Sequence, residues 1–362
     1  MQEYYIGSNL NTWLSGLLQR LNVATVFLVR GKDSYVSCGA SNIIGEILVD
    51  GKMQTIHFSD FSINPKIEDV NKGVSLCMAE FPEIILAVGG GSTIDTAKLI
   101  RYYVLQETGK YIPLIAVPTT AGSGAEATHF SVCYINEEKH SIEDSTILPD
   151  YAFIYPEFTY HNDAYLTACT GFDAVAQAME SYWSVKSTDE SRDYSLKALN
   201  LLWKQLPLLM GDLKNESLRR QVAEGAYYAG RAINITTTTA PHAFSYKFTS
   251  LYSYAHGYAV ALTFPFFFAL NTLSEELQSS LNEEEYKERM NLLLRVLECK
   301  CTGKKSRQLY MEGYISSLGL LVRKFTLSEI ALVLNSFNMQ RAKNNPVVID
   351  RGIVEELGCY LA

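Results

Sequence analysis

The feature that most constrains the fold of this chain is an apolar run that ends in three glycines. Residues 83–91 read EIILAVGGG, a pattern typical of a buried strand, and the following STIDTAKLIRYYV (92–104) has helical spacing with Ser92 as its expected cap. Two more apolar strands are expected at 25–31 and 111–120, and a helix at 66–80. Strands separated by helices predict a parallel, doubly wound α/β sheet.

The pattern changes after about residue 160. Strand-like runs nearly vanish, and long helical periods take over at 166–185, 191–206 and 282–297. We therefore expect an α/β dinucleotide-binding domain at 1–160 and an all-helical metal and substrate domain at 161–362, with a ligand cleft between them. The apolar stretch 259–270 (AVALTFPFFFAL) is too short to cross a bilayer and is expected to be a core helix.

Composition narrows the class of protein. The 362 residues are 48% apolar and 19% charged, with a formal net charge of −8, which fits a globular protein and argues against nucleic-acid binding. The seven cysteines form no disulfide framework, and the first residues, MQEYYIGSNL, lack a secretory signal. We expect a cytoplasmic protein with reduced thiols and no membrane segment.

Two turns at strand ends could bind phosphate. Gly89, Gly90 and Gly91 let the backbone approach a ligand, and the N–H groups of the following helix attract an anion. A second turn, PTTAGSGAEAT (118–128), offers hydroxyl groups and also follows an apolar strand. Together they favour a dinucleotide; the alternative is a pair of tight turns without a ligand.

Two of the six histidines, His242 and His256, lie fourteen residues apart in APHAFSYKFTSLYSYAHG (240–257). Asp173 is a lone acid in an apolar helical stretch, and Gln177 follows it by four residues on the same face. One carboxylate with two imidazoles is a normal ligand set for a divalent first-row metal. The alternatives are histidines satisfied within the core and a helix-capping Asp173 after Gly171.

Four segments, GGGSTIDTAK, PTTAGSGAEAT, TGFDAVAQAMESY and PHAFSY followed by HG at His256, together resemble the iron-containing alcohol dehydrogenase family. They stand in the family's order and spacing, and the similarity extends from about residue 20 to NNP (344–346). The resemblance implies a dehydroquinate synthase-like fold and a metal-dependent, NAD(P)H-linked alcohol dehydrogenase or aldehyde reductase. A homodimer is compatible with it.

The resemblance places the metal ligands on Asp173, Gln177, His242 and His256. Gln177 departs from the family, which usually has histidine there; either the glutamine binds weakly or three protein ligands and a water remain. Looser metal retention follows in both cases, with zinc as an alternative to iron. Tyr246 is a second departure from histidine. It either donates a proton to the product or only shapes the pocket, because tyrosine is a poor base at neutral pH.

The same resemblance assigns the cofactor contacts. The pyrophosphate would lie on Gly90, Gly91 and Ser92, adenine and ribose near Thr119, Thr120 and Ser123, with further contacts at Lys139 and Leu166. The predicted cofactor-binding set is Gly31, Gly89, Gly90, Gly91, Ser92, Asp95, Thr119, Thr120, Ser123, Lys139 and Leu166. Gly31 replaces the aspartate of NAD-preferring members, and Arg30, Lys32 and Ser34 are near it. We therefore favour NADPH, with NADH as the alternative.

A finer resemblance, to the hydroxyethylphosphonate dehydrogenase, or phosphonoacetaldehyde reductase, branch, is carried by DAVAQAMESYW, HAFSYKFT, HGYAVALTFP and the terminal NNP. Its phosphonate would need cationic or donor groups, for which His129 and Lys247 are candidates; the alternatives are a packed His129 and a solvent-facing Lys247. Two other functions stay open: a polyol or sugar-acid dehydrogenase of the same superfamily, and a metal-free nucleotide-binding protein that has lost catalysis.

Overall fold

The structure is a computed structural model that describes residues 2–136, 138–273, 275–334 and 342–362. It divides into two compact units, the first made of residues 1–162 and 214–227 and the second of 163–213 and 228–362. Helix α9 (Glu216–Thr236) begins in the first unit and ends in the second. The domain limits expected from the sequence, 1–160 and 161–362, stay a prediction.

The first unit is built on a six-stranded sheet in the order β1-β8-β5-β4-β2-β3, and every neighbouring pair is parallel. The strands expected from the sequence are β2, β4 and β5. The sheet consists of β1 (Glu3–Ile6), β2 (Thr25–Arg30), β3 (Gln54–Phe58), β4 (Ile84–Gly89), β5 (Leu114–Pro118) and β8 (Tyr151–Ile154).

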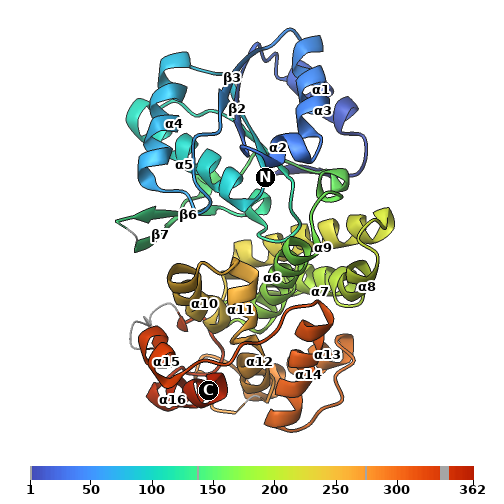
Figure 1. The fold of residues 1–362 in the computed structure, drawn as a ribbon, viewed down its shortest axis with the longest axis vertical. Coiled ribbons are helices and arrows are strands. Elements are labelled where there is room, and N and C mark those ends of the chain that lie inside the picture. The colour runs from blue at the N-terminus through green and yellow to red at the C-terminus, as the bar shows by residue number, and fades with distance from the viewer. Residues whose placement is uncertain (1, 137, 274, 335–341) are drawn as a thin grey trace. The chain divides into compact units, whose positions relative to one another are not determined.

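Helices cover both faces of this sheet (Figure 1). Leu86 and Val88 of β4 pack with α1 and α3, whereas Ile85 and Ala87 pack with α4 and α5. This alternation buries both faces and confirms the doubly wound α/β prediction. The helices are α1 (Leu10–Arg20), α2 (Ser34–Ser37), α3 (Ala40–Asp50), α4 (Ile67–Glu80) and α5 (Gly91–Thr108).

A separate antiparallel hairpin, β6 (Phe130–Ile135) and β7 (Glu138–Glu143), follows the second hydroxyl-rich turn. Short 3₁₀ turns lie at Ala125–Ala127, Ser145–Ile147 and Pro156–Thr159. This hairpin is not predicted from the sequence, because its strands alternate in polarity only weakly.

The strand order places the predicted nucleotide turns together. The chain runs from β2 outward to β3 and then returns to β4 on the other side of β2, so β2 and β4 flank a topological switch point. Gly31 N donates to Val88 O over 3.3 Å, and Thr119 N donates to Gly89 O over 3.0 Å. The carboxyl ends of β2, β4 and β5 therefore adjoin, at the edge where open α/β sheets bind ligands.

Two local expectations were wrong. Helix α5 begins at Gly91 with Gly90 as its N-cap, so Ser92 lies inside the first turn, where its Oγ accepts a hydrogen bond from Asn64 N over 3.3 Å. The stretch 259–270 is not one helix: α11 ends at Ala261 and α12 begins at Phe264. Pro265 explains the break, since proline fits the first turn of a helix but not its interior.

The second unit is helical. Its elements are α6 (Ala164–Trp183), α7 (Asp189–Leu202), α8 (Gln205–Gly211), the end of α9, α10 (Ala240–Tyr252), α11 (His256–Ala261), α12 (Phe264–Leu273), α13 (Glu283–Val296), α14 (Lys304–Ser317), α15 (Leu327–Leu334) and α16 (Arg351–Leu361). The predicted all-helical part is confirmed in the described residues. None of the helices described has the length and apolar character needed to span a membrane.

Candidate functional site

Helix α6 carries a line of buried polar side chains through the apolar interior of the second unit. Asp173, Gln177 and Glu180 are spaced by four and three residues and share one helix face. Their exposed fractions are 5%, 3% and 0%. Asp163 is the N-cap of α6, accepting from Leu166 N over 2.7 Å, so the helix-cap alternative for Asp173 does not apply.

The two histidines come from the helices that follow. His242 lies in the first turn of α10, and His256 is the first residue of α11. Gly257 lets α11 approach α6 closely: a Cβ there would lie 1.9 Å from Cys169 O and 3.1 Å from the Asp173 Cβ. The glycine in the HG pair therefore brings His256 next to Asp173.

The structure brings three of the predicted metal ligands together. One ligand atom from each of Asp173, His242 and His256 lies within 4.8 Å of the others. His242 Nε2 is 3.0 Å from Asp173 Oδ1, and the two imidazole rings meet edge to face with centroids 5.3 Å apart. The Gln177 amide hydrogen-bonds Asp173, and its buried Oε1 has no donor among the described residues.

Glu180 is a site residue that the sequence analysis missed. Its Oε1 hydrogen-bonds His242 Nδ1, while its Oε2 accepts from Thr239 N over 2.5 Å and from Thr239 Oγ1 over 2.8 Å. A carboxylate on Nδ1 fixes the imidazole so that Nε2 faces the cluster, which is how proteins orient metal-binding histidines. A sequence signal existed: Glu180 continues the polar face of Asp173 and Gln177 in an otherwise apolar helix.

Close contacts within this cluster shift the pKa values of His242 and Asp173 so that each favours its charged form. Burial opposes the charge on His242, but Glu180 and Asp173 outweigh it and raise the pKa of His242 to about 9. Burial alone would raise the pKa of Asp173, whereas His256, His242 and Gln177 together hold it below its ordinary value. The cluster thus pairs a buried carboxylate with imidazole nitrogens, a donor set that suits a divalent iron or zinc ion.

The turn before α10 is held from two sides. Thr237 has a left-handed φ of 58°. Asn344, in the NNP segment, donates through Nδ2 to Thr236 O over 2.6 Å and to Thr238 O over 3.1 Å. Trp183 Nε1 donates to Thr239 Oγ1 over 3.0 Å. These bonds fix the start of α10, and with it His242.

Tyr246 lies one turn after His242 on α10. Its ring is nearly parallel to that of His256, with an interplanar angle of 8° and centroids 6.1 Å apart. The next residue, Lys247, is half-buried, and its ammonium group has no hydrogen-bond or ion-pair partner among the described residues. A partly desolvated, unpaired cation attracts anionic ligands.

In the first unit, the two predicted nucleotide turns touch. A Cβ on Gly91 would lie 2.7 Å from Ser123 Oγ, and one on Gly90 would lie 3.3 Å from Thr120 Oγ1. A Cβ on Gly89 would lie 2.3 Å from Thr93 Oγ1. A side chain at Gly89 or Gly91 would therefore force a neighbour to shift, and the hydroxyl groups of the second turn lie beside the N-terminus of α5.

Gly31 lies next to the same strand ends. A Cβ on it would lie 2.0 Å from Ser34 Oγ, and Arg30 Nη1 donates to Gly31 O over 3.3 Å and to Lys32 O over 3.4 Å. The Arg30 guanidinium also lies over the Tyr35 ring. Gly31 itself carries no carboxylate, and the Ser34 hydroxyl group and the Arg30 guanidinium lie beside it, while Asp33 in the same turn is the N-cap of α2.

The remaining predicted residues lie in several places. Asp95 is in α5, with its carboxylate 4.0 Å from Lys98 Nζ. His129 Nε2 is 3.4 Å from Glu143 Oε1. Leu166 lies in the first turn of α6 and is 37% exposed. Lys139 is in β7 opposite Tyr134, and its side chain lies outside the described part of the structure.

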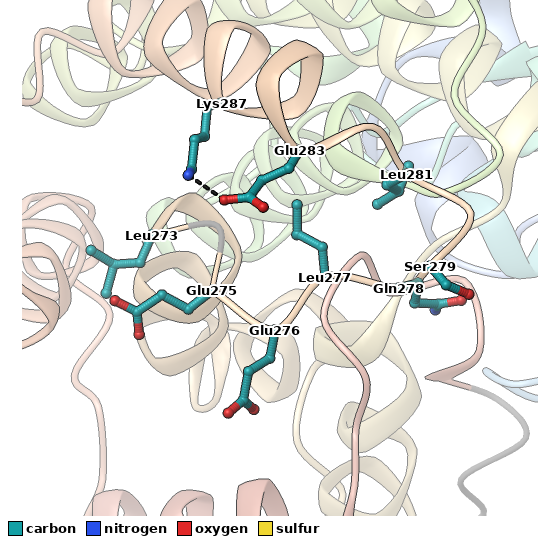
Figure 2. Close-up of a pocket in the computed structure, with 9 residues that line it drawn as sticks. All are labelled: Leu273, Glu275, Glu276, Leu277, Gln278, Ser279, Leu281, Glu283 and Lys287. Carbon is teal, nitrogen blue, oxygen red and sulfur yellow. Dashed lines mark hydrogen bonds and ion pairs between the residues drawn. The ribbon is translucent and has the colours of Figure 1, made fainter.

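A pocket of about 570 Å³ lies between the end of α12 and the start of α13 (Figure 2). Three glutamates line it, of which Glu283 pairs with Lys287. The lining residues are Leu273, Glu275, Glu276, Leu277, Gln278, Ser279, Leu281, Glu283 and Lys287. None of them is a predicted site residue.

The sequence matches the profile of iron-containing alcohol dehydrogenase over residues 2–156, and that of the C-terminal part of the Fe-containing alcohol dehydrogenase family over 167–342. It is 29% identical to long-chain-alcohol dehydrogenase 1 of Geobacillus thermodenitrificans over 224 residues, 58% of this chain and 57% of that protein. It is 30% identical to the bifunctional aldehyde-alcohol dehydrogenase AdhE of Escherichia coli over 62% of this chain and 28% of that protein. The matched region thus spans about half or less of these relatives.

Solved structures agree over the whole chain. The sulfoacetaldehyde reductase from Bifidobacterium kashiwanohense, in complex with NAD⁺, superposes with a TM-score of 0.86 at 26% identity, covering 100% of this chain and 97% of that one. An alcohol dehydrogenase from Oenococcus oeni has the same fold, with a TM-score of 0.86 at 22% identity over 99% and 98% of the two chains. The chain belongs to the iron-containing alcohol dehydrogenase family.

Proposed function

We propose that this protein is a metal-dependent oxidoreductase that interconverts a small aldehyde and its alcohol with a nicotinamide dinucleotide. The observation that carries the proposal is the cluster of buried Asp173 and His242 with half-buried His256, whose ligand atoms lie within 4.8 Å of one another in a member of this family. The switch-point turns at Gly89–Gly91 and Thr119–Ser123 supply the expected place for the pyrophosphate.

The donor set fits a divalent metal, with Gln177 either as a fourth, weaker ligand or as a hydrogen-bonding partner of Asp173. A bound ion would act as a Lewis acid that polarises the aldehyde carbonyl. Asp173, His242 and His256 would hold that ion, and Glu180, which hydrogen-bonds Nδ1 of His242, would orient Nε2 toward it. We infer loose metal retention, because a neutral amide replaces the imidazole usual in the family.

Reduction adds a hydride to the carbonyl carbon and a proton to the carbonyl oxygen. We assign the proton to the Tyr246 hydroxyl group, whose ring stacks on that of His256. Replacing Tyr246 by phenylalanine keeps the stacked ring and removes the proton. A Tyr246→Phe enzyme that keeps the wild-type kcat for reduction would mean that Tyr246 only shapes the pocket.

For the cofactor we propose NADPH over NADH. Ser34 and Arg30 lie at the turn after β2, and Gly31 puts no carboxylate at the position where NAD-preferring members carry one. A Gly31→Asp change needs Ser34→Gly with it, since the new Cβ would otherwise lie 2.0 Å from Ser34 Oγ. The double variant should weaken NADPH binding at least tenfold while NADH binding persists, as measured by fluorescence titration. Equal loss for both cofactors would contradict the assignment.

For the substrate we propose a small aldehyde that carries an anionic head group, with phosphonoacetaldehyde as the specific candidate. Half-buried Lys247, one residue after Tyr246, supports this choice, since its ammonium group has no partner within the described part of the chain. The similar sulfoacetaldehyde reductase is named for an aldehyde with a comparable charged group. His129 is the weaker candidate, since it already faces Glu143.

The test compares NADPH and NADH oxidation with phosphonoacetaldehyde, sulfoacetaldehyde and acetaldehyde, in the presence of Fe²⁺, Zn²⁺ or a chelator. We expect metal-dependent turnover with the anionic aldehydes preferred, and a Lys247→Gln variant that loses this preference but keeps acetaldehyde turnover. Preference for acetaldehyde in the wild type would contradict the proposal of an anionic substrate. Turnover only with polyols, or no turnover with any metal, would contradict the proposed aldehyde reductase activity.

A cytoplasmic location and a homodimer stay predictions.

A further inference from the structure

Two arginine side chains converge on one serine hydroxyl group where α6 ends and α7 begins. Arg289 Nη1 in α13 donates to Ser187 Oγ over 2.5 Å. Arg192 Nη1 in α7 donates to the same oxygen over 3.1 Å and to Ser187 O over 3.3 Å. Helix α13 packs against both α6 and α7, whose labels lie close together in Figure 1.

The Arg289 guanidinium is not satisfied by these contacts. Its Nε and Nη2 atoms are buried and have no acceptor among the described residues. Burial lowers the pKa of Arg289, and the neighbouring Arg192 charge lowers it further, while Tyr286, Tyr182 and Glu285 act in the opposite direction. Buried donors without an acceptor cost free energy, and two close positive charges add to that cost.

Nearby acids do not remove this excess of donors. Asp189 pairs with Arg192, but its side chain is 99% exposed. Glu285 influences Arg289 electrostatically, yet accepts no hydrogen bond from Nε or Nη2 in the described structure. Both Ser187 lone pairs face arginine nitrogens, so its own hydroxyl proton is available for another acceptor.

We propose that Arg192, Arg289 and Ser187 bind a small tetrahedral oxyanion of the phosphate class. The Nε and Nη2 edge of a guanidinium matches two oxygens of such an anion, and Ser187 can donate to a third. The N-terminus of α7, which is capped by Thr188 directly after Ser187, adds a favourable dipole. The site contains none of the proposed metal, cofactor or substrate residues, and it is independent of the proposed reaction.

The experiment measures thermal unfolding of the full chain in inorganic phosphate, with KCl at matched ionic strength as the reference. We expect the unfolding temperature to rise saturably with phosphate concentration and not with KCl. Arg289→Gln and Arg192→Gln should each weaken the apparent phosphate affinity at least tenfold. Arg351→Gln is the matched control, since Arg351 is 91% exposed on α16, and its phosphate response should equal that of the wild type.

An Asp173→Asn variant should keep the phosphate response, which separates this site from binding at the proposed metal site. Ser187→Ala, a small change that leaves both arginines, should weaken the response without unfolding the chain, and it decides the matter if an arginine variant does not fold. No rise in the wild type beyond that in KCl would overturn the proposal, because water would then satisfy Arg289. An unchanged response in a folded Arg289→Gln or Ser187→Ala variant would overturn it as well.

Discussion

Glu180 hydrogen-bonds Nδ1 of His242 at a position where neither side chain is accessible to solvent, with exposed fractions of 0% and 3%. The same carboxylate holds Thr239 at the start of α10. One residue of α6 therefore sets both the position of α10 and the orientation of a predicted metal ligand on it. This contact is the most informative in the candidate site, because it links the packing of α6 and α10 to the orientation of a predicted metal ligand.

Replacing Glu180 with glutamine should weaken metal binding by about 10- to 100-fold, the usual effect of removing a partner of a metal-bound histidine. The amide keeps the size of the side chain but reduces the basicity that the carboxylate gives to His242. Calorimetric titration of Zn²⁺ into metal-free protein measures the change. Glu190→Gln, at an exposed position on α7, is the control. Wild-type affinity in Glu180→Gln would mean that the contact is only structural.

Restoring a histidine at position 177 should tighten metal retention. Gln177→His replaces a neutral amide by an imidazole on the face of α6 that already carries Asp173. We expect the half-time of metal loss to a chelator to lengthen at least tenfold. The half-time is measured by analysing the metal content of the protein after gel filtration at timed intervals. Gln177→Leu should shorten or not change that half-time. A histidine variant that loses metal as fast as the wild type would argue against a ligand position at residue 177.

Removing the metal should lower the stability of the protein. A ligand that binds only the folded chain raises its stability by about 2.7 kcal/mol at one hundred times its dissociation constant. Scanning calorimetry should therefore show a higher unfolding temperature with Zn²⁺ or Fe²⁺ than with a chelator, and no difference in Asp173→Ala. A metal-induced rise that survives in Asp173→Ala would place the metal elsewhere.

Gly91→Ala should weaken dinucleotide binding more than it weakens the fold. The added Cβ would lie 2.7 Å from Ser123 Oγ, so the second turn must shift away from α5. We expect at least a tenfold increase in the dissociation constant, measured by quenching of NADPH fluorescence. Gly45→Ala, in α3 with no atom within 4 Å of the new Cβ, is the control and should bind normally. Normal binding by Gly91→Ala would contradict the assignment of this turn.

Stability of the first unit should depend on the protonation of Glu126. Burial raises the pKa of this carboxyl to about 7, and its own backbone and Lys98 oppose the rise. The folded state therefore favours the neutral form of Glu126. Its contribution to the free energy of unfolding is complete below the unfolded pKa of about 4.5 and is lost as the pH rises through about 7. Urea unfolding should show a loss on the order of 2 kcal/mol between pH 5 and 8.

Glu126→Gln should flatten that profile, because the amide does not titrate. Glu190→Gln, at an exposed position, should leave the wild-type slope unchanged. Parallel pH profiles for the wild type and Glu126→Gln would show that Glu126 stays ionised in the folded protein.

Much of the architecture was predictable because its signals are local. Residues 83–104 are predicted to be a strand, a glycine turn and a helix, and they form β4, the turn and α5. The apolar run, the glycines and the helical period each depend on residues that are close together in the sequence. The family resemblance, carried by four motifs, is confirmed by the profile matches. The start of α5 and the break before Pro265 were mispredicted, because capping and helix ends depend on one or two residues.

The sequence by itself determined which residue types are present: one acid and two histidines with metal-ligand chemistry, and the hydroxyl groups and glycines of the two turns. Only the tertiary structure decided their partners. Glu180 is 62 residues from His242, Asn344 is 108 residues from Thr236, and Arg289 is 102 residues from Ser187. Such contacts depend on how distant helices pack, and packing is a property of the whole core that no local period encodes.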